Sequence, residues 1–219
     1  MTKKVAVILS GCGVYDGAEI HESVITLLRL DQRGAKVQCF APNVPQMHVI
    51  NHLTGEEMPE SRNVLVESAR IARGEVKDIR EADANDFDAL IVPGGFGSAK
   101  NLSNFAVQGC GCTVHPDVLA LAEAFAEAGK PVGLICISPA LAAKIYGPGV
   151  VCTIGHDAAT SAAIVKMGGT HEECDVSEIV EDTARKLVST PAYMLAKSIG
   201  EAASGINKLV DRVLELTHE

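Results

Sequence analysis

Strands and helices alternate in the hydrophobic pattern of the chain. Residues 4–9 alternate around β-branched side chains, which predicts a strand, and residues 18–30 place apolar side chains at helical spacing, which predicts a helix. This succession recurs along the sequence. We predict further strands within 33–42, 74–79, 88–97 and 131–136, and further helices within 61–73, 115–130 and 193–216.

This alternation predicts an α/β fold with one doubly wound, mostly parallel sheet flanked by helices, of the flavodoxin-like kind. Hydrophobic residues make up 47% of the sequence and aromatic residues only 4%, so the core is expected to be aliphatic. Ligands bind beyond the carboxyl ends of the strands in such sheets. Residues 10–19, residues 93–101 and Cys136 follow three predicted strands and are therefore expected to line one cleft.

Two segments do not fit the alternation. Residues 43–60 are rich in Pro, Asn and His, and residues 174–191 are typical of a hairpin around the sequence EDTARK. We interpret both as insertions on a single domain that spans residues 1–219, because no internal repeat or low-complexity linker divides the chain.

The net charge, the lengths of the apolar runs and the cysteine content bear on which partners and which cellular compartment to expect. The formal net charge is -9, with no Lys/Arg cluster to offset it, which disfavours nucleic acid as a partner. No stretch approaches the ~18 apolar residues of a membrane span. Seven scattered cysteines do not resemble a secreted disulfide framework. We therefore expect a protein of the cytoplasm without a membrane partner.

The glycines after the first predicted strand do not form a dinucleotide site. Gly11, Gly13 and Gly17 miss the GxGxxG spacing by one residue, and the second predicted strand ends without an acid for a ribose. The phosphate-binding pattern GxxxxGK[ST] is also absent. No cofactor is expected.

Two histidine-containing groups are weak metal candidates. Cys110, Cys112 and His115 are closely spaced but lack a second pair of ligands, which favours a loop over a structural zinc site. His48 and His52 stand four residues apart without the glutamate of a zinc protease. We expect no metal.

The sequence GLICISP, residues 133–139, places Cys136 between an apolar run and a Ser-Pro pair that is suited to begin a helix. Two interpretations are open. Cys136 is either a small hydrophobic side chain at a strand end or the nucleophile of a sharp strand-to-helix turn, a nucleophile elbow. In the second case, the helix end favours its thiolate.

Three motifs resemble the PfpI-like branch of the class I glutamine amidotransferase-like superfamily: GAEIHESVI (17–25), VPGGFGSAKNL (92–102) and ICISPALAAKI (135–145). The chain is more closely similar to the ElbB group, named for enhancing lycopene biosynthesis and regarded as glyoxalase-like. That resemblance runs nearly from end to end and rests on the segments ILSGCGVYDGAEIHE, INHLTGE, SRNVLVE, CTIG and TPAYMLA.

The resemblance implies roles for individual residues. Cys136 matches the elbow nucleophile and Glu22 the glutamate that hydrogen-bonds it. Gly95 and Ile137 match positions whose backbone N–H groups form an oxyanion hole. Protease-type members carry His where this chain has Ile137, so a peptidase triad is disfavoured. His156 is offset by one residue from a histidine of deglycase-like members and is a possible accessory residue.

The implied activity is that of a cofactor-independent and glutathione-independent glyoxalase, a glyoxalase III-type hydro-lyase that acts on small aldehydes such as glyoxal and methylglyoxal. Burial beside a thiolate is expected to raise the pKa of Glu22. Relatives imply a homodimer. The alternatives are a redox-sensing or binding protein with incidental activity, or a glutaminase subunit in which His171 and Glu173 form an HxE element.

Overall fold

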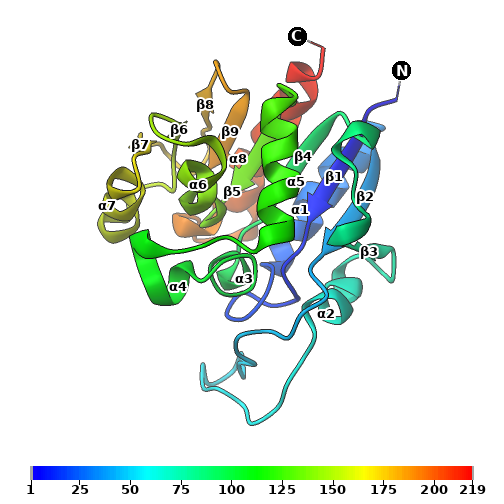
Figure 1. Ribbon diagram of the computed structural model, residues 1–219, viewed down its shortest axis with the longest axis vertical. Helices are drawn as coiled ribbons and strands as arrows, with labels where there is room; N and C mark the ends of the chain where they lie inside the picture. Colours follow the sequence, from blue (N-terminus) through cyan, green and yellow to red (C-terminus); the bar gives the residue numbers. More distant parts are fainter. Residues whose placement is uncertain (1, 219) are drawn as a thin grey trace.

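A seven-stranded sheet forms the centre of the molecule, with helices on both of its faces (Figure 1). The computed structural model describes residues 2–218. The strands of this sheet are β1 (Lys4–Ile8), β2 (Lys36–Ala41), β3 (Val76–Asp78), β4 (Ala89–Val92), β5 (Val132–Ile135), β8 (Val180–Asp182) and β9 (Leu187–Thr190). Their order is β3-β2-β1-β4-β5-β9-β8, and all neighbours are parallel except the antiparallel pair β8 and β9. The predicted doubly wound α/β fold is confirmed.

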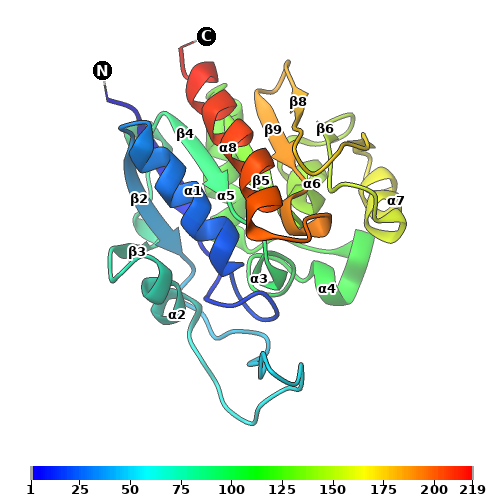
Figure 2. The same cartoon turned by 180° about the vertical axis from the view of Figure 1, so that it is seen from behind.

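The helices form two layers. One face of the sheet carries α1 (Ile20–Gln32), α2 (Val64–Ile71) and α8 (Ile199–Leu216), as Figure 2 shows from behind. The other face carries α5 (Pro116–Glu127), α6 (Ala142–Tyr146) and α7 (Ala158–Lys166), the last beside a small sheet of β6 (Val151–Cys152) and β7 (Thr170–His171). Two short helices, α3 (Phe96–Lys100) and α4 (Phe105–Gln108), follow β4. Within residues 2–218, no helix combines the length and hydrophobicity needed to cross a membrane.

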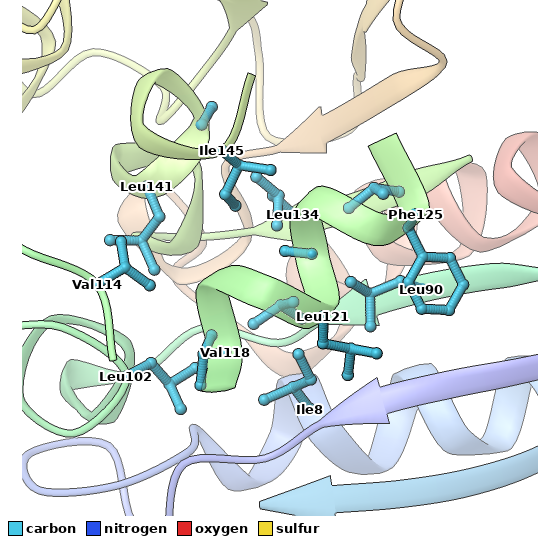
Figure 3. Packing of buried hydrophobic residues seen from close by; sticks show 14 of the residues in the cluster. Ile8, Leu90, Leu102, Val114, Val118, Leu121, Phe125, Leu134, Leu141 and Ile145 are labelled. Carbon is cyan, nitrogen blue, oxygen red and sulfur yellow. The ribbon is translucent and has the colours of Figure 1, made fainter. Parts of the chain in front are cut away.

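Alternate side chains of the strands supply two aliphatic cores. Ile8, Leu90 and Leu134 contribute to the core between the sheet and α5 (Figure 3). Phe125 is the largest side chain that α5 adds to this core. Val7 and Ile91 point to the opposite layer and pack with α1 and α8. Strands buried on both faces account for the continuous apolar runs in the sequence.

Element boundaries follow local capping. Helix α5 begins with Pro116 at its first turn, as predicted. Helix α8 begins later than the predicted residue 193, because the Ser198 side chain accepts a hydrogen bond from the Glu201 N–H and caps the helix there. Helix α7 was not predicted, since Ile164 is its only fully buried residue and its apolar pattern is correspondingly weak.

Residues 174–191 form the predicted hairpin, but its second strand lies inside the main sheet. Strand β9 pairs in parallel with β5, and Thr190 accepts a hydrogen bond from the Cys136 N–H at 3.0 Å. The segment is thus part of the sheet that holds Cys136.

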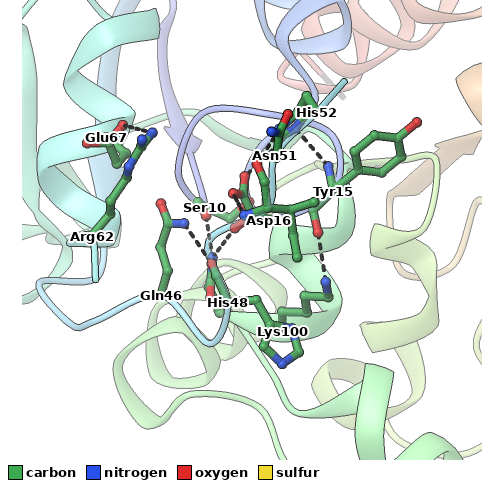
Figure 4. A network of polar contacts seen from close by, with 12 residues as sticks. Ser10, Tyr15, Asp16, Gln46, His48, Asn51, His52, Arg62, Glu67 and Lys100 are labelled. Carbon is green, nitrogen blue, oxygen red and sulfur yellow. Dashed lines mark hydrogen bonds and ion pairs between the residues drawn. The ribbon is translucent and has the colours of Figure 1, made fainter. Parts of the chain in front are cut away.

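Residues 43–60 project from the edge of the molecule and fold back on the loop after β1 (Figure 1). The Ile50 N–H donates to Asp16 Oδ2 at 2.8 Å, and the Tyr15 N–H donates to His52 Nε2 at 3.2 Å (Figure 4). His52 Nε2 is therefore a hydrogen-bond acceptor that fixes the loop, and its Nδ1 lies 3.0 Å from the Ile50 carbonyl oxygen.

Candidate active site

The candidate site lies at the point in the sheet where the order of successive strands reverses. Strands β2 and β3 lie on one side of β1, and β4 and β5 on the other, so the carboxyl ends of β1 and β4 mark the topological switch point. Helix α1 begins beside this point, and Cys136 follows β5 directly. Segments far apart in the sequence therefore meet at one edge of the sheet.

Cys136 has the strained backbone of an elbow. Its φ is +63°, a left-handed conformation that costs a non-glycine residue about 1–3 kcal/mol. Its N–H donates a hydrogen bond to the Thr190 carbonyl oxygen. The bend also packs closely against Gly94, just after β4, since a Cβ on Gly94 would lie 2.4 Å from the Cys136 Cβ. Strain that the surroundings enforce in this way is typical of functional residues.

Ser138 stabilises the elbow in a manner that the sequence did not indicate. The Ser-Pro pair was expected to begin a helix with Ser138 as its N-cap, but the N-cap is Ile137 and Ser138 is the first residue inside the 3-10 turn. Its buried hydroxyl donates to the Pro93 carbonyl oxygen at 2.9 Å and lies 2.7 Å from Ser98 Oγ. The turn after Cys136 is therefore joined to the loop after β4.

Glu22 is completely buried at the first turn of α1 and shares a hydrogen bond with the Cys136 thiol. Its two carboxyl oxygens also accept backbone N–H groups, Oε2 from Gly94 at 2.9 Å and Oε1 from Tyr193 at 3.2 Å. The structure thus places Glu22 and Cys136 in direct contact, in the arrangement that the resemblance implies.

Burial raises the pKa of Glu22 to about 8, and repulsion from Glu19 contributes to the increase. Burial thus raises this pKa as predicted, but the second cause is Glu19 rather than a thiolate, and the hydrogen bond with Cys136 lowers the pKa. Glu19 is the N-cap of α1, and its Oε2 accepts the Glu22 N–H at 2.7 Å. Glu19 therefore caps the helix from a buried position.

The expected thiolate character of Cys136 is not found. Burial, and secondly the Glu22 carboxyl, raise the pKa of the Cys136 thiol well above its ordinary value. Hydrogen bonds from the backbone N–H groups of Gly95 and Ile137 to the sulfur act in the opposite direction but do not prevail. The segment after the sulfur begins as a 3-10 turn over residues 138–141 and continues directly into the short helix α6, and its positive end does not outweigh the effect of burial.

The predicted oxyanion-hole positions lie directly at the sulfur. The N–H groups of Gly95 and Ile137 both hydrogen-bond it. Gly95 has a φ of +94°, and a Cβ there would lie 2.4 Å from the Gly17 carbonyl oxygen. The backbone can present this N–H only because the residue is glycine.

A pocket of about 390 Å³ opens above the thiol, within the usual size range of small-molecule sites. Its walls are largely apolar. They are formed by Val14, Gly95, Phe96, Cys136, Ile137, Asp157, Thr160, Tyr193 and Met194.

Three polar residues of this pocket were not identified from the sequence. Asp157 and Thr160 form the start of α7, and their spacing, typical of a helix cap, was the available signal. Tyr193 donates its N–H to Glu22, and its hydroxyl lies 2.7 Å from His21 Nδ1. No pattern in the sequence indicates this contact, because residue 193 follows a backbone turn at Ala192 with a φ of +44°.

The histidines considered from the sequence lie elsewhere. His156 is exposed and is not among the described residues that line the pocket. His171 Nε2 accepts the Ile154 N–H at 3.1 Å, and His171 and Glu173 are also outside the pocket lining, so no HxE element faces Cys136.

The other cysteine and histidine cluster has a structural explanation. His115 caps α5, with Nδ1 accepting the Asp117 N–H at 3.3 Å. All seven cysteines are free. Among residues 2–218, no group of three or more His, Cys, Asp or Glu side chains is arranged to hold a metal ion.

Comparison with known proteins identifies the family to which the chain belongs. The sequence profile described as the DJ-1/PfpI family matches residues 3–184, which is most of the chain. The chain belongs to the DJ-1/PfpI family. Its fold is thereby related to that of other members of this family.

Three relatives illustrate the range of similarity. The human mitochondrial protein called glutamine amidotransferase-like class 1 domain-containing protein 3 is 50% identical over 98% of this chain and 83% of its own length. The crystal structure of an isoprenoid biosynthesis protein with an amidotransferase-like domain from Ehrlichia chaffeensis is 39% identical over 98% of this chain and 99% of that chain, with a TM-score of 0.92. A glyoxalase III from Candida albicans has a TM-score of 0.65 at 15% identity, over 98% and 97% of the two chains, and shares the fold alone.

These relatives bear on two expectations. The human protein is mitochondrial, so the expected cytoplasmic location finds no support in it. The family and the amidotransferase-like fold are established, whereas the finer assignment to the ElbB group stays a prediction from the sequence motifs.

Proposed function

We propose that the protein is a glutathione-independent glyoxalase that converts glyoxal to glycolate and methylglyoxal to lactate. The observation that carries the proposal is the contact between the strained Cys136 thiol and a fully buried Glu22 carboxyl whose pKa is about 8. A carboxyl group of this pKa exchanges protons readily near neutral pH, as an acid and base catalyst must.

The proposed reaction begins with addition of sulfur to the aldehyde carbon, C1. Because the thiol is protonated at neutral pH, ionised Glu22 accepts its proton as the S–C bond forms. The N–H groups of Gly95 and Ile137 hold the new oxyanion, which then takes the proton back from Glu22 to give a neutral hemithioacetal.

Glu22 next acts as the base of an isomerisation. Its carboxylate removes the C1 proton, and the electron pair passes to the neighbouring carbonyl to form an enediolate. Return of this proton to C2, together with transfer of the C1 hydroxyl proton to the C2 oxygen, leaves a thioester of the 2-hydroxy acid on Cys136. Water then cleaves the thioester and restores the thiol. C1 is oxidised and C2 is reduced within one molecule, so the reaction is balanced without an external oxidant.

The thioester and hemithioacetal are directly testable. After brief exposure to methylglyoxal and acid quenching, peptide mass spectrometry should locate the substrate mass on the Cys136 peptide. A matched Cys39→Ala variant should keep the adduct, since Cys39 is buried on β2. An adduct confined to another cysteine would refute the assignment of Cys136 as nucleophile.

A redox-sensing or binding role with incidental activity is the alternative. The raised pKa of Cys136 argues against it, because peroxide reacts with thiolates. Mild peroxide treatment followed by mass spectrometry separates the two: a sensor requires that Cys136 is oxidised first and rapidly. Oxidation of the partly exposed Cys110 ahead of Cys136 would count against the sensor.

A homodimer is proposed as the assembly. Helix α1 exposes Ile20, Val24 and Leu28, which are spaced four residues apart and so lie on one side of the helix. This apolar stripe is a suitable surface for a second copy of the chain. Light scattering after size exclusion should give twice the chain mass for the wild type and the monomer mass for Val24→Glu.

A further inference from the structure

One wall of the pocket is the amino-terminal end of α7. Asp157 is the N-cap of this helix, and its Oδ2 accepts the Thr160 N–H at 2.8 Å. Both residues line the pocket together with Cys136. Asp157 is also exposed, so a solvent-accessible carboxylate belongs to the lining that a substrate meets on its way to the sulfur.

The charge of the pocket is set by this one residue. Asp157 is the only charged side chain among the described lining residues. Hydrogen bonds from Thr160 hold its pKa below the ordinary value, so it is ionised at every pH suited to an assay. Glu22, behind the sulfur, has a pKa of about 8 and is largely neutral at pH 7.

Positive groups near the pocket do not compensate this carboxylate. The Lys100 ammonium lies over the Phe96 ring, 5.4 Å from its centroid, and donates to the Tyr15 carbonyl oxygen, outside the pocket lining. The positive end of the α7 dipole would attract anions, but the Asp157 cap neutralises it. Among the described lining residues, an anionic substrate therefore meets the Asp157 carboxylate without a positively charged side chain to offset it.

We propose that Asp157 is a specificity-determining residue that makes the pocket accept neutral and cationic α-oxoaldehydes and reject those that carry a carboxylate or phosphate. The substrate class rests on the proposed glyoxalase function. The charge selection at Cys136 does not, because any reagent that reaches the sulfur must pass the same carboxylate.

Alkylation of Cys136 tests the selection without turnover. Iodoacetamide is neutral and iodoacetate is anionic, and the two are nearly equal in size. With either reagent, the S–C bond forms, iodide leaves and the thiol proton passes to solvent. Mass spectrometry of the Cys136 peptide gives both rates, and the rates with free N-acetylcysteine correct for intrinsic reactivity.

The corrected preference is the ratio of the iodoacetamide rate to the iodoacetate rate at Cys136, divided by the same ratio for N-acetylcysteine. At low ionic strength, this preference should be about threefold to fivefold larger in the wild type than in Asp157→Asn. Asparagine is an equally good N-cap, so α7 is retained. The difference should shrink in about 0.5 M NaCl, because salt screens an exposed charge but does not alter packing. Asp83→Asn, at a cap outside the pocket, should behave as the wild type.

Equal preferences in the wild type and Asp157→Asn would overturn the proposal. Failure of both reagents to label Cys136, even in long incubations at alkaline pH that supply thiolate, would also overturn it, since small ligands would then not reach the sulfur through this pocket. Turnover of phenylglyoxal compared with 4-carboxyphenylglyoxal adds the catalytic measurement. Absence of turnover with both, alongside a charge-dependent alkylation, would refute the glyoxalase and leave the role of Asp157 intact.

Discussion

Replacing Glu22 by Gln removes a buried group that binds a proton far more tightly in the folded chain than in the unfolded one. The pKa of Glu22 rises from an ordinary 4.5 to about 8 in the fold. Below pH 4.5 the carboxyl is neutral in both states. Between pH 4.5 and about 8 the unfolded chain releases the proton while the folded chain keeps it, so stability is lost as the pH rises. At ~1.4 kcal/mol per pH unit, the loss across this window is ~5 kcal/mol.

Gln stays neutral throughout, but it introduces a constant cost. Both Glu22 oxygens accept backbone N–H groups, from Gly94 and from Tyr193, so the amide nitrogen of Gln must face one of these donors. That mismatch destabilises the variant by ~1–3 kcal/mol at every pH. The variant should therefore be the less stable protein at pH 4.5 and the more stable one at pH 8.

Urea unfolding of both proteins at several values between pH 4.5 and pH 8 measures this change. The difference in their free energies of unfolding isolates Glu22, because all other titrating groups are common to the two chains. We expect the difference to shift by ~5 kcal/mol and to change sign. A difference that stays constant within ~1 kcal/mol across the window would show that Glu22 is not protonated in the fold, and the proposed proton transfers would lose their basis.

Further predictions concern activity and packing. The kcat/KM for glyoxal should rise with pH up to about 8 and then level off, because ionised Glu22 is the base; a profile that falls over this range would contradict the assignment. Glu22→Gln should lower kcat by ~10²–10⁴-fold, whereas Glu19→Gln should keep most of kcat and move the pH profile to lower pH, since Glu19 raises the pKa of Glu22. Gly94→Ala should reduce kcat by at least ~10²-fold, because its Cβ would lie 2.4 Å from the Cys136 Cβ, and retained activity would show that the elbow can shift freely. Cys39→Ala should lower the free energy of unfolding by ~1–3 kcal/mol through the cavity it leaves and keep kcat; the opposite pattern would identify the wrong cysteine.

The sequence predicts those parts of the fold in which local pattern and tertiary packing agree. Strands β1, β4 and β5 are buried on both faces and leave continuous apolar runs, and Pro116 marks the start of α5. The contact between Glu22 and Cys136 joins two elements far apart in the chain. Periodicity alone could not select Glu22 over Glu19, and the family resemblance was needed for that choice.

Other features depend on tertiary contacts that leave no local pattern. The protonated state of Cys136 follows from complete burial beside Glu22, whereas its sequence context suggested activation by a helix end. The Tyr193 N–H reaches Glu22 because the chain turns at Ala192 before α8 begins. Asp157 enters the pocket on α7, a helix whose weak apolar pattern did not predict it.

Isomerisation of an α-oxoaldehyde by Cys136 and Glu22 together is tested by the steady-state formation of glycolate from glyoxal, followed by NMR, with the wild type and with Cys136→Ala. We expect glycolate at an ordinary enzymatic rate, about 1 s⁻¹ or faster, from the wild type and none above background from the variant. Equal glycolate formation by a folded Cys136→Ala variant, or none by the wild type, would contradict this mechanism.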